Sequence, residues 1–178
     1  TGRTVGIYVE FKAPAWHATQ GRDLGAALLT ALNAHGYRRA GDPIYVQCFE
    51  AEALERLRTE LGTELKLVQL LSTGAEYAAL VTPEGLRRVA TYAQGIGPSL
   101  GQIITAGADH GPVVTPLVRD AHAAGLVVHP YTVRADALPK EIKDPAALLA
   151  LLIEEAAVDG FFTDQTDLGV RAVAAADR

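Results

Sequence analysis

Apolar segments of strand length alternate with amphipathic segments of helix length along nearly the whole chain. Strands are predicted over residues 5–11, 44–49, 65–71, 95–98, 126–133 and 160–163. Helices are predicted after Asp23, with a stop at His35-Gly36, and over residues 51–61, 83–93, 117–124, 145–157 and 168–176. This alternation is typical of parallel βα units. Such units build either an open, doubly wound sheet or a closed (β/α)8 barrel.

Chain length narrows this choice. A complete (β/α)8 barrel takes about 250 residues and at least about 200, whereas this chain has 178. Six predicted strands in that length indicate either an open sheet or an incomplete barrel. The first strand is not followed by a glycine-rich phosphate loop, which disfavours a dinucleotide-binding sheet. Because no linker or low-complexity stretch interrupts the pattern, we expect a single domain over residues 1–178.

Composition excludes several classes of protein. The formal charge of −5 disfavours nucleic acid as a partner. The longest apolar runs fall far short of the roughly 20 residues of a membrane helix, so no membrane span is expected. The single cysteine, Cys48, cannot form an internal disulfide. The chain contains no methionine and no signal peptide, and it opens at Thr1 directly before its first strand. We therefore expect further residues upstream.

Glu10 and Lys12 stand at the end of the first predicted strand. A spacing of two residues places both side chains on one face of a strand. The carboxyl ends of parallel strands carry the ligand sites of barrels and open sheets. The two residues form either a simple ion pair or part of a ligand site, and the local pattern leaves both interpretations open.

The second predicted strand ends in Gln47-Cys48-Phe49-Glu50. Alternation turns Gln47 and Phe49 toward the site side of the sheet and Cys48 toward the helices. Taken alone, Phe49 is more typical of a core residue. Cys48 is predicted to be a buried, small hydrophobic residue and not a nucleophile.

Two later strand ends carry further polar residues. His129 and Tyr131 share one face of the fifth predicted strand. We interpret His129 as a hydrogen-bonded structural histidine and Tyr131 as a candidate stacking wall. Asp164 follows the last strand, and its expected role is to cap the next helix.

Six strings, read in order, extend this picture over nearly the whole chain. They are GIYVEFKAPAWHATQGRDL, IYVQCFEAEALERL, LKLVQLL, YAQGIGPS, LVVHPYTVRADALP and DGFFTDQTDLGV. Together they closely resemble the C-terminal two-thirds of bacterial glycerophosphodiester phosphodiesterases, in particular a subtype that is periplasmic or secreted in many bacteria. The resemblance implies a (β/α)8 barrel, here an incomplete one that lacks its first strands.

The resemblance also implies an activity and residue roles. Members of the family hydrolyse glycerophosphodiesters, with a divalent metal, to glycerol 3-phosphate and an alcohol. The Glu-x-Lys strand of the family maps onto Glu10 as a metal ligand and Lys12 as a phosphate contact. Phe49 matches an aromatic residue of the substrate pocket, and Tyr131 stands where many members carry tryptophan at the glycerol site. Ca²⁺ or Mg²⁺ is the implied metal, since hard cations prefer carboxylate oxygens.

The chain also departs from the family pattern. The opening strand with its His-Arg-Gly motif, the Glu-x-Asp strand with two metal carboxylates and the His-Asp motif are all missing. None of the five histidines stands in a family motif, so no catalytic residue is assigned. Thr166 replaces the proline of the usual Thr-Asp-x-Pro-Asp. The chain therefore resembles the later part of the enzyme without its catalytic first part, and we expect the isolated chain to be inactive.

Three interpretations follow, in order of preference. The first is a piece of a glycerophosphodiester phosphodiesterase that acts on a small-molecule substrate. The second is a non-catalytic partial-barrel protein that binds a phosphate ester or a partner chain. The third, an unrelated open-sheet sugar or phosphate enzyme, is disfavoured by the matched strings. In an incomplete barrel the strands at residues 5–11 and 160–163 would be open edges, so we expect edge pairing, including homo-oligomers.

Overall fold

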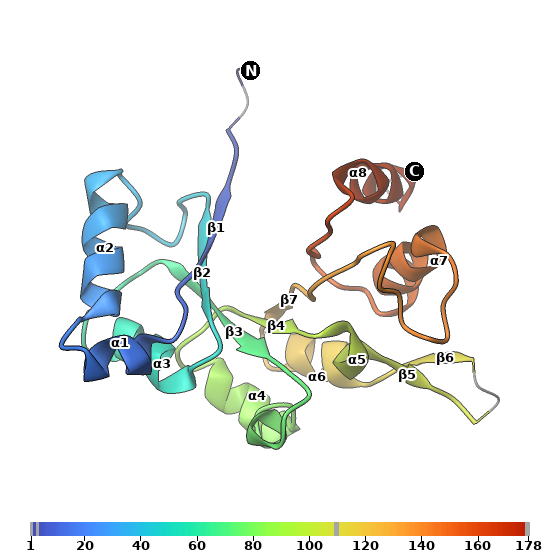
Figure 1. The fold of residues 1–178 in the computed structure, drawn as a ribbon, viewed down its shortest axis with the longest axis horizontal. Helices are drawn as coiled ribbons and strands as arrows, with labels where there is room; N and C mark the ends of the chain where they lie inside the picture. The colour runs from blue at the N-terminus through green and yellow to red at the C-terminus, as the bar shows by residue number, and fades with distance from the viewer. Residues whose placement is uncertain (1, 3, 109–110, 177–178) are drawn as a thin grey trace. The chain divides into compact units, whose positions relative to one another are not determined.

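The computed structural model describes residue 2 and residues 4–108 and 111–176 (Figure 1). It divides into two compact units. The first comprises Thr1–Leu70 and Arg88–Gly95, and the second comprises Leu71–Arg87 and Ile96–Arg178. Strands and helices alternate in both units, as the sequence indicates. The prediction of one domain over residues 1–178 stays a prediction.

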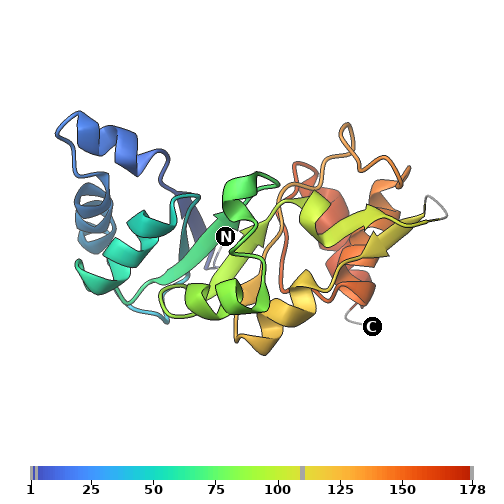
Figure 2. The same cartoon turned by 90° about the horizontal axis from the view of Figure 1, so that it is seen from below.

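The first unit is built on parallel strands that follow one another in sequence order. They are β1 (Ile7–Glu10), β2 (Ile44–Cys48) and β3 (Lys66–Leu71). Helices α1 (Pro14–Thr19) and α2 (Leu24–Ala34) connect β1 to β2, and α3 (Ala51–Thr59) connects β2 to β3. Helices α2 and α3 lie on the same side of the β1–β2 pair (Figures 1 and 2). The predicted strands are confirmed, with β1 shorter than expected, and α1 was not predicted.

The ends of α2 show how local sequence sets its limits. The Asp23 carboxylate accepts a hydrogen bond from the Ala26 amide at 3.0 Å, which satisfies an otherwise unpaired donor of the first turn. After Ala34 the chain turns at Gly36, whose φ of 88° lies in the left-handed region. Glycine adopts that conformation without a steric penalty. Both predicted boundaries of this helix are confirmed.

The two faces of β2 have different environments. Ile44, Val46 and Cys48 are at most 1% exposed, on the side that α3 covers with buried Leu54 and Leu57. Full burial of such aliphatic side chains stabilises the fold by about 1.5–3 kcal/mol each. The helix-facing side predicted for Ile44, Val46 and Cys48 is therefore confirmed.

The opposite face of the same strands is polar and aromatic. Tyr45 stacks on Tyr8 with ring centroids 5.0 Å apart, and the Lys66 ammonium lies 4.6 Å from the centre of the Tyr45 ring. The strand register sets Glu10 beside Gln47 on this face. This face therefore carries polar groups toward the carboxyl ends of β1 and β2.

A buried glutamine in β3 secures the end of β2. Gln69 is completely buried, and its Nε2 donates to the carbonyl oxygens of Phe49 and Leu70, both at 2.9 Å. Its Oε1 accepts a hydrogen bond from the Tyr92 hydroxyl at 2.9 Å. The Phe49 carbonyl lies where the chain leaves β2 for α3, so this side chain fixes the backbone at that point.

The second unit contains a further parallel pair. Strand β4 (Gly95–Pro98) lies next to β7 (Val127–Val128), and the pairing continues through the His129 amide, which donates to Ile96 O at 3.0 Å. All of β4 is buried. The predicted strand at residues 95–98 is confirmed although glycine and proline disfavour strands, because a short buried strand needs only small residues to approach its neighbours.

The helices and hairpin of the second unit extend this frame. They are η1 (Ala75–Tyr77), α4 (Pro83–Val89, whose last two residues are counted with the first unit), α5 (Leu100–Ile103), β5 (Ile104–Ala106), β6 (Pro112–Val114), α6 (Leu117–Ala123), α7 (Pro145–Ala150), the π-helical turn η2 (Leu151–Glu155) and α8 (Thr166–Ala176). The antiparallel β5–β6 hairpin continues from α5 as a narrow arm (Figures 1 and 2) and was not predicted. The helix predicted over 145–157 is split between α7 and η2.

The last two predicted strands are shorter than expected. Residues 126–133 contain only β7 and two bridges, and residues 160–163 contain only the parallel bridge of Thr163 to Val133. The Val133 amide still donates to Phe162 O at 2.8 Å, so the predicted neighbours do meet. Asp164 does not stand at the start of α8. Its carboxylate pairs with Arg134 at 3.1 Å, which replaces the expected capping role.

The free edge of β1 is one of the two edges at which we predict pairing with another chain. Within the described residues β1 pairs with β2 alone, and Ile7 is 36% exposed. An exposed parallel edge offers backbone groups to another strand. Pairing of this edge with another chain stays a prediction.

The Gln69 network leads to a first prediction. Gln69→Leu keeps the side-chain volume similar but leaves the Tyr92 hydroxyl and the Phe49 carbonyl without their partner, so the free energy of unfolding should fall by about 2–4 kcal/mol. Urea denaturation followed by circular dichroism measures this change. Gln20→Leu is the matched control, because Gln20 is exposed. Equal stability of the two variants would contradict the assigned role of Gln69.

Burial of His129 leads to a second prediction. Burial lowers the pKa of His129 below its usual value near 6.5, and the nearby Asp159 carboxylate only partly opposes this effect. The unfolded chain therefore binds a proton more readily, and this contribution to stability is complete above about pH 6.5 and lost as the pH falls below it. Urea midpoints between pH 7.5 and 5.5 should fall less steeply in His129→Gln than in the unsubstituted chain. His35→Gln, at an exposed position, is the control, and equal slopes for all three proteins would refute the assignment.

Candidate functional site

A pocket of about 230 Å³ opens at the carboxyl ends of β1 and β2. We call it the site pocket, and it is lined by Glu10, Phe11, Lys12, Ala13, Cys48, Phe49 and Glu50. Parallel neighbours end at the same edge of a sheet, so the residues that follow each strand come together there. The site pocket unites Glu10, Lys12 and Phe49, which are three of the four substrate or metal residues predicted from the sequence.

Glu10 is the last residue of β1, and Lys12 follows two positions later, beyond the end of the strand. Glu10 Oε2 and Lys12 Nζ are 3.5 Å apart, and the side chains are 25% and 77% exposed, respectively. An exposed ion pair of this kind contributes only about 0–1 kcal/mol. Lys12 can therefore turn from Glu10 to a bound anion at little energetic cost, so the ion pair is compatible with a ligand site.

Glu50 is a lining residue to which the sequence analysis assigned no role. It directly follows Phe49, and its Oε2 accepts a hydrogen bond from the Ala15 amide at 2.9 Å, across 35 positions of the chain. The contact ties the segment after β1 to the start of α3. In the sequence, the one signal that Glu50 belongs to the site is its position after a predicted strand, next to Phe49.

Carboxylate oxygens in the site pocket are suitable ligands for a hard cation. Glu10 and Glu50 both line it, whereas Ca²⁺ and Mg²⁺ take six or more oxygen ligands. Across residues 4–108 and 111–176 no group of three or more histidine, cysteine, aspartate or glutamate side chains is arranged to hold a metal ion. The described side chains therefore do not form a complete metal site by themselves, and no chemical step is derived through a metal.

Cys48 lines the site pocket, but its thiol is a poor nucleophile. Its residue is 1% exposed, and burial raises the pKa of its thiol to about 11, with a smaller contribution from the Glu50 and Glu10 carboxylates. The thiolate is the reactive form of cysteine, so a thiol with this pKa is a poor nucleophile at neutral pH. The interpretation of Cys48 as a buried, small hydrophobic residue is confirmed.

Tyr131 belongs to the second unit. Its hydroxyl donates to the Leu71 carbonyl at 2.9 Å, and its amide donates to the Pro98 carbonyl at 3.1 Å. These contacts hold Tyr131 at the carboxyl end of the β4–β7 pair, which is the strand end that the sequence indicates. Its part in a substrate pocket stays a prediction.

Known proteins are similar in sequence to this chain over almost its whole length. A glycerophosphodiester phosphodiesterase of Haemophilus influenzae is 34% identical over 192 aligned positions, which cover 96% of this chain and 53% of the relative. One of Treponema pallidum is 29% identical over 96% of this chain and 54% of the relative. The chain thus spans about half the length of the curated relatives it matches.

Solved structures show the same fold. The structure of a Silicibacter pomeroyi protein named as a glycerophosphoryl diester phosphodiesterase superposes on this one with a TM-score of 0.67 and 22% sequence identity. The superposition covers 96% of this chain and 50% of that one. The glycerophosphodiester phosphodiesterase of Thermotoga maritima matches with a TM-score of 0.59 at 16% identity, over 93% of this chain and 57% of that one. The predicted fold class, an incomplete (β/α)8 barrel, is confirmed.

The family assignment rests on the sequence match. The pattern of the Glycerophosphoryl diester phosphodiesterase family matches residues 1–168, which includes every string on which the resemblance was based except the last two residues of the sixth. The curated relatives match the chain over 96% of its length. The chain therefore belongs to the glycerophosphoryl diester phosphodiesterase family.

Proposed function

We propose that this chain forms part of an enzyme that hydrolyses glycerophosphodiesters to glycerol 3-phosphate and an alcohol. The observation that carries the proposal is the site pocket, where Glu10, Lys12 and Phe49 meet at the carboxyl ends of β1 and β2. Its support is membership of a family whose curated relatives bear the name glycerophosphodiester phosphodiesterase. The reaction class is that of a phosphoric diester hydrolase.

Three residues of the site pocket, together with Tyr131 of the second unit, have proposed parts. Lys12 is largely exposed and weakly paired, so its ammonium can bind the phosphoryl oxygens and stabilise their negative charge. Phe49 supplies an apolar wall for the glycerol carbons, and Tyr131 is proposed as a glycerol-site residue on the family resemblance alone. Glu10 is proposed as one ligand of a Ca²⁺ or Mg²⁺ ion, whose coordination the described histidine, cysteine, aspartate and glutamate side chains do not complete.

No residue of the site pocket is assigned to proton transfer. The family resemblance gives that role to two histidines in motifs that this chain does not match. Positioned acid–base groups contribute about 10²–10⁴-fold to a rate. We therefore propose that substrate contacts reside in this chain and that the isolated chain does not hydrolyse the diester.

The proposal also covers the substrate and the cellular location of the protein. The substrate is a small molecule, and a periplasmic or secreted location is proposed on the family resemblance alone. Within the described residues, no helix combines the length and the apolar character needed to cross a bilayer. Secretion is tested by fractionating cells of the source organism with an antibody against the chain.

A third prediction tests the activity. The 178-residue chain should release no glycerol 3-phosphate from glycerophosphocholine, with or without added Ca²⁺, because proton transfer lacks a donor and an acceptor. In a longer protein that carries this chain together with the family's histidine motifs, Glu10→Ala should abolish turnover. Lys12→Ala should lower kcat/KM by at least tenfold, through loss of a charge-assisted phosphate contact. An enzyme-coupled assay of glycerol 3-phosphate measures each rate.

The controls distinguish the alternatives. Lys140→Ala changes an equivalent charge in the second unit, outside the site pocket, and should leave turnover unchanged. Metal-dependent hydrolysis by the isolated chain would overturn the assignment of proton transfer and would make His17 or His129 the next candidates. Binding of a phosphate ester without hydrolysis by the longer protein would instead favour a non-catalytic, ligand-binding protein.

Cys48 provides a fourth prediction. Burial raises the pKa of this thiol to about 11, so it should react with iodoacetamide at pH 7.5 much more slowly than glutathione does. It should react readily once urea has unfolded the chain. Mass spectrometry measures the modified fraction. Cys48→Ala should leave ligand binding at the site pocket unchanged. Fast labelling of the folded chain would contradict the buried thiol.

A further inference from the structure

Helix α1 begins directly after Lys12 and Ala13 of the site pocket, and its own sequence gives it little support. Its six residues, Pro14–Thr19, include none that is buried. Helices shorter than about 12 residues are marginal in water unless tertiary contacts hold them. The position of α1 after β1 must therefore come from contacts with other parts of the chain.

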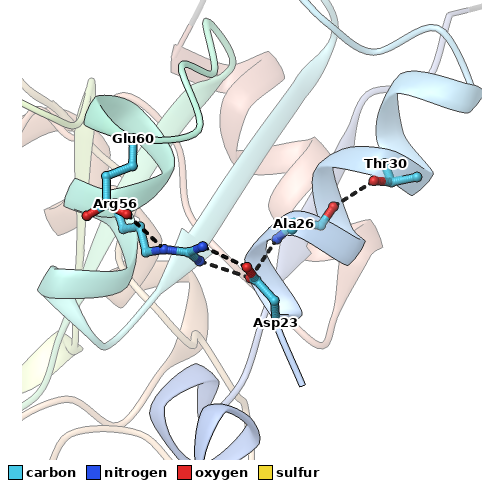
Figure 3. A network of polar contacts seen from close by, with 5 residues as sticks. All are labelled: Asp23, Ala26, Thr30, Arg56 and Glu60. Atoms are coloured by element: carbon cyan, nitrogen blue, oxygen red, sulfur yellow. Dashed lines mark hydrogen bonds and ion pairs between the residues drawn. The ribbon is translucent and has the colours of Figure 1, made fainter. Parts of the chain in front are cut away.

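The first turn of α1 begins with a residue that cannot cap it. This residue is Ala13, whose methyl group cannot accept a hydrogen bond. Its φ of 50° and ψ of 48° are left-handed, a conformation that carries a steric penalty for residues other than glycine. Helix α2 provides the contrast, since its N-cap Asp23 accepts the Ala26 amide (Figure 3). The chain between Lys12 and α1 is thus held in a conformation that its local sequence does not favour.

Glu50 supplies the missing cap from a distant part of the sequence. Its Oε2 accepts a hydrogen bond from the amide of Ala15 at 2.9 Å. Ala15 is the second residue of α1, and an N–H at that position has no acceptor within its own helix. Glu50 is the N-cap residue of α3, yet its side chain makes no capping hydrogen bond to α3. One carboxylate at the end of β2 therefore fixes the helix that follows Lys12.

This contact lies next to the proposed phosphate ligand. Glu50, Lys12 and Ala13 all line the site pocket, and only Ala13 and Pro14 separate Lys12 from the amide that Glu50 binds. The Lys12 side chain is 77% exposed and only weakly paired with Glu10, so its own contacts do little to place it. The backbone from which it extends decides where the ammonium can reach. A fixed backbone also leaves fewer conformations to lose when an anion binds.

We propose that Glu50 is a positioning residue of the site, which by capping α1 holds the backbone at Lys12 where the ammonium can reach the phosphoryl oxygens. Glu50 does not bind the phosphate, because its own negative charge repels an anion. It acts through the Ala15 amide. The inference rests on the proposed function of Lys12 and adds the residue that places it.

Two substitutions separate the hydrogen bond from the charge. Glu50→Gln and Glu50→Ala both remove the carboxylate, but only glutamine keeps an oxygen that can accept the Ala15 amide. Glycerol 3-phosphate is titrated into the ¹⁵N-labelled 178-residue chain, and its affinity is measured from the amide shifts of Lys12 and Phe49. Glu50→Ala should bind about fivefold more weakly than Glu50→Gln, which corresponds to about 1 kcal/mol, the net value of one hydrogen bond. Glu50→Gln should bind at least as tightly as the unsubstituted chain, since a negative charge is removed.

The order of α1 is measured without any ligand. Trp16, in the first turn of α1, is the only tryptophan of the sequence, so its fluorescence anisotropy reports on this helix. Glu50→Ala should lower the anisotropy and speed hydrogen exchange at the Ala15 amide, whereas Glu50→Gln should leave both near their original values. Glu52→Ala is the matched control, because it removes an exposed carboxylate from the first turn of α3, outside the site pocket. It should change neither measurement and leave the affinity unchanged.

Glu50→Ser covers the case in which Glu50→Ala does not fold, which urea midpoints reveal. Serine is a favourable N-cap residue for α3, but its side chain is too short to reach Ala15. Glu50→Ser should therefore match the behaviour expected of Glu50→Ala in affinity, in anisotropy and in hydrogen exchange.

A double-substitution cycle shows whether Glu50 acts through Lys12. In a chain that carries Lys12→Ala, Glu50→Ala and Glu50→Gln should bind glycerol 3-phosphate equally, because the side chain that the cap positions is gone. A difference of the original size in that chain would overturn the inference, since a role in folding alone would weaken binding with or without Lys12.

The remaining outcomes separate the inference from the proposed function. Equal affinities of Glu50→Gln and the alanine or serine variant with Lys12 present, or equal order of α1 in them, would overturn the inference and leave the proposed function standing. Failure of glycerol 3-phosphate to shift the amides of Lys12 and Phe49 in the unsubstituted chain would overturn the proposed function, and the inference with it.

Discussion

The completely buried amide of Gln69 is the contact on which the candidate site depends. It bonds to the Phe49 carbonyl at the point where β2 ends, and the Tyr92 hydroxyl completes its hydrogen bonding. A buried amide without partners costs more than its hydrogen bonds gain, so this position tolerates little movement. The rigid end of β2 then carries Phe49 and Glu50 to fixed places in the site pocket.

The groups that would meet a ligand are held much less tightly. Lys12 is exposed and lies 3.5 Å from Glu10 in a pair of little energetic value. A stable strand frame with weakly committed charges at its end is a suitable arrangement for a binding site, because the ligand replaces an existing contact without unfolding anything. The Glu50–Ala15 hydrogen bond joins α1 to the start of α3. The Asp23–Arg56 pair joins the start of α2 to α3 (Figure 3).

Most of the strand and helix pattern could be predicted from the sequence. Alternating residues in β2 and the glycine stop after α2 are local signals, because they depend on side-chain period and on backbone conformation. The β5–β6 hairpin and the short α1 carry weak local signals, since their residues bury little apolar surface. The strand predicted at residues 160–163 is only a bridge, because hydrogen bonding to residues 130–133 is confined to a few positions.

The sequence by itself determined that strands and helices alternate, that Glu10 and Lys12 come together at a strand end, and that Cys48 faces the helices. These follow from spacing alone, since side chains alternate along any strand. Only the tertiary structure decided that Glu50 of the site pocket binds the Ala15 amide and that Asp23 at the start of α2 pairs with Arg56 of α3. Those contacts join positions 33 to 35 residues apart, and their geometry depends on how α1, α2 and α3 pack against each other and the strands.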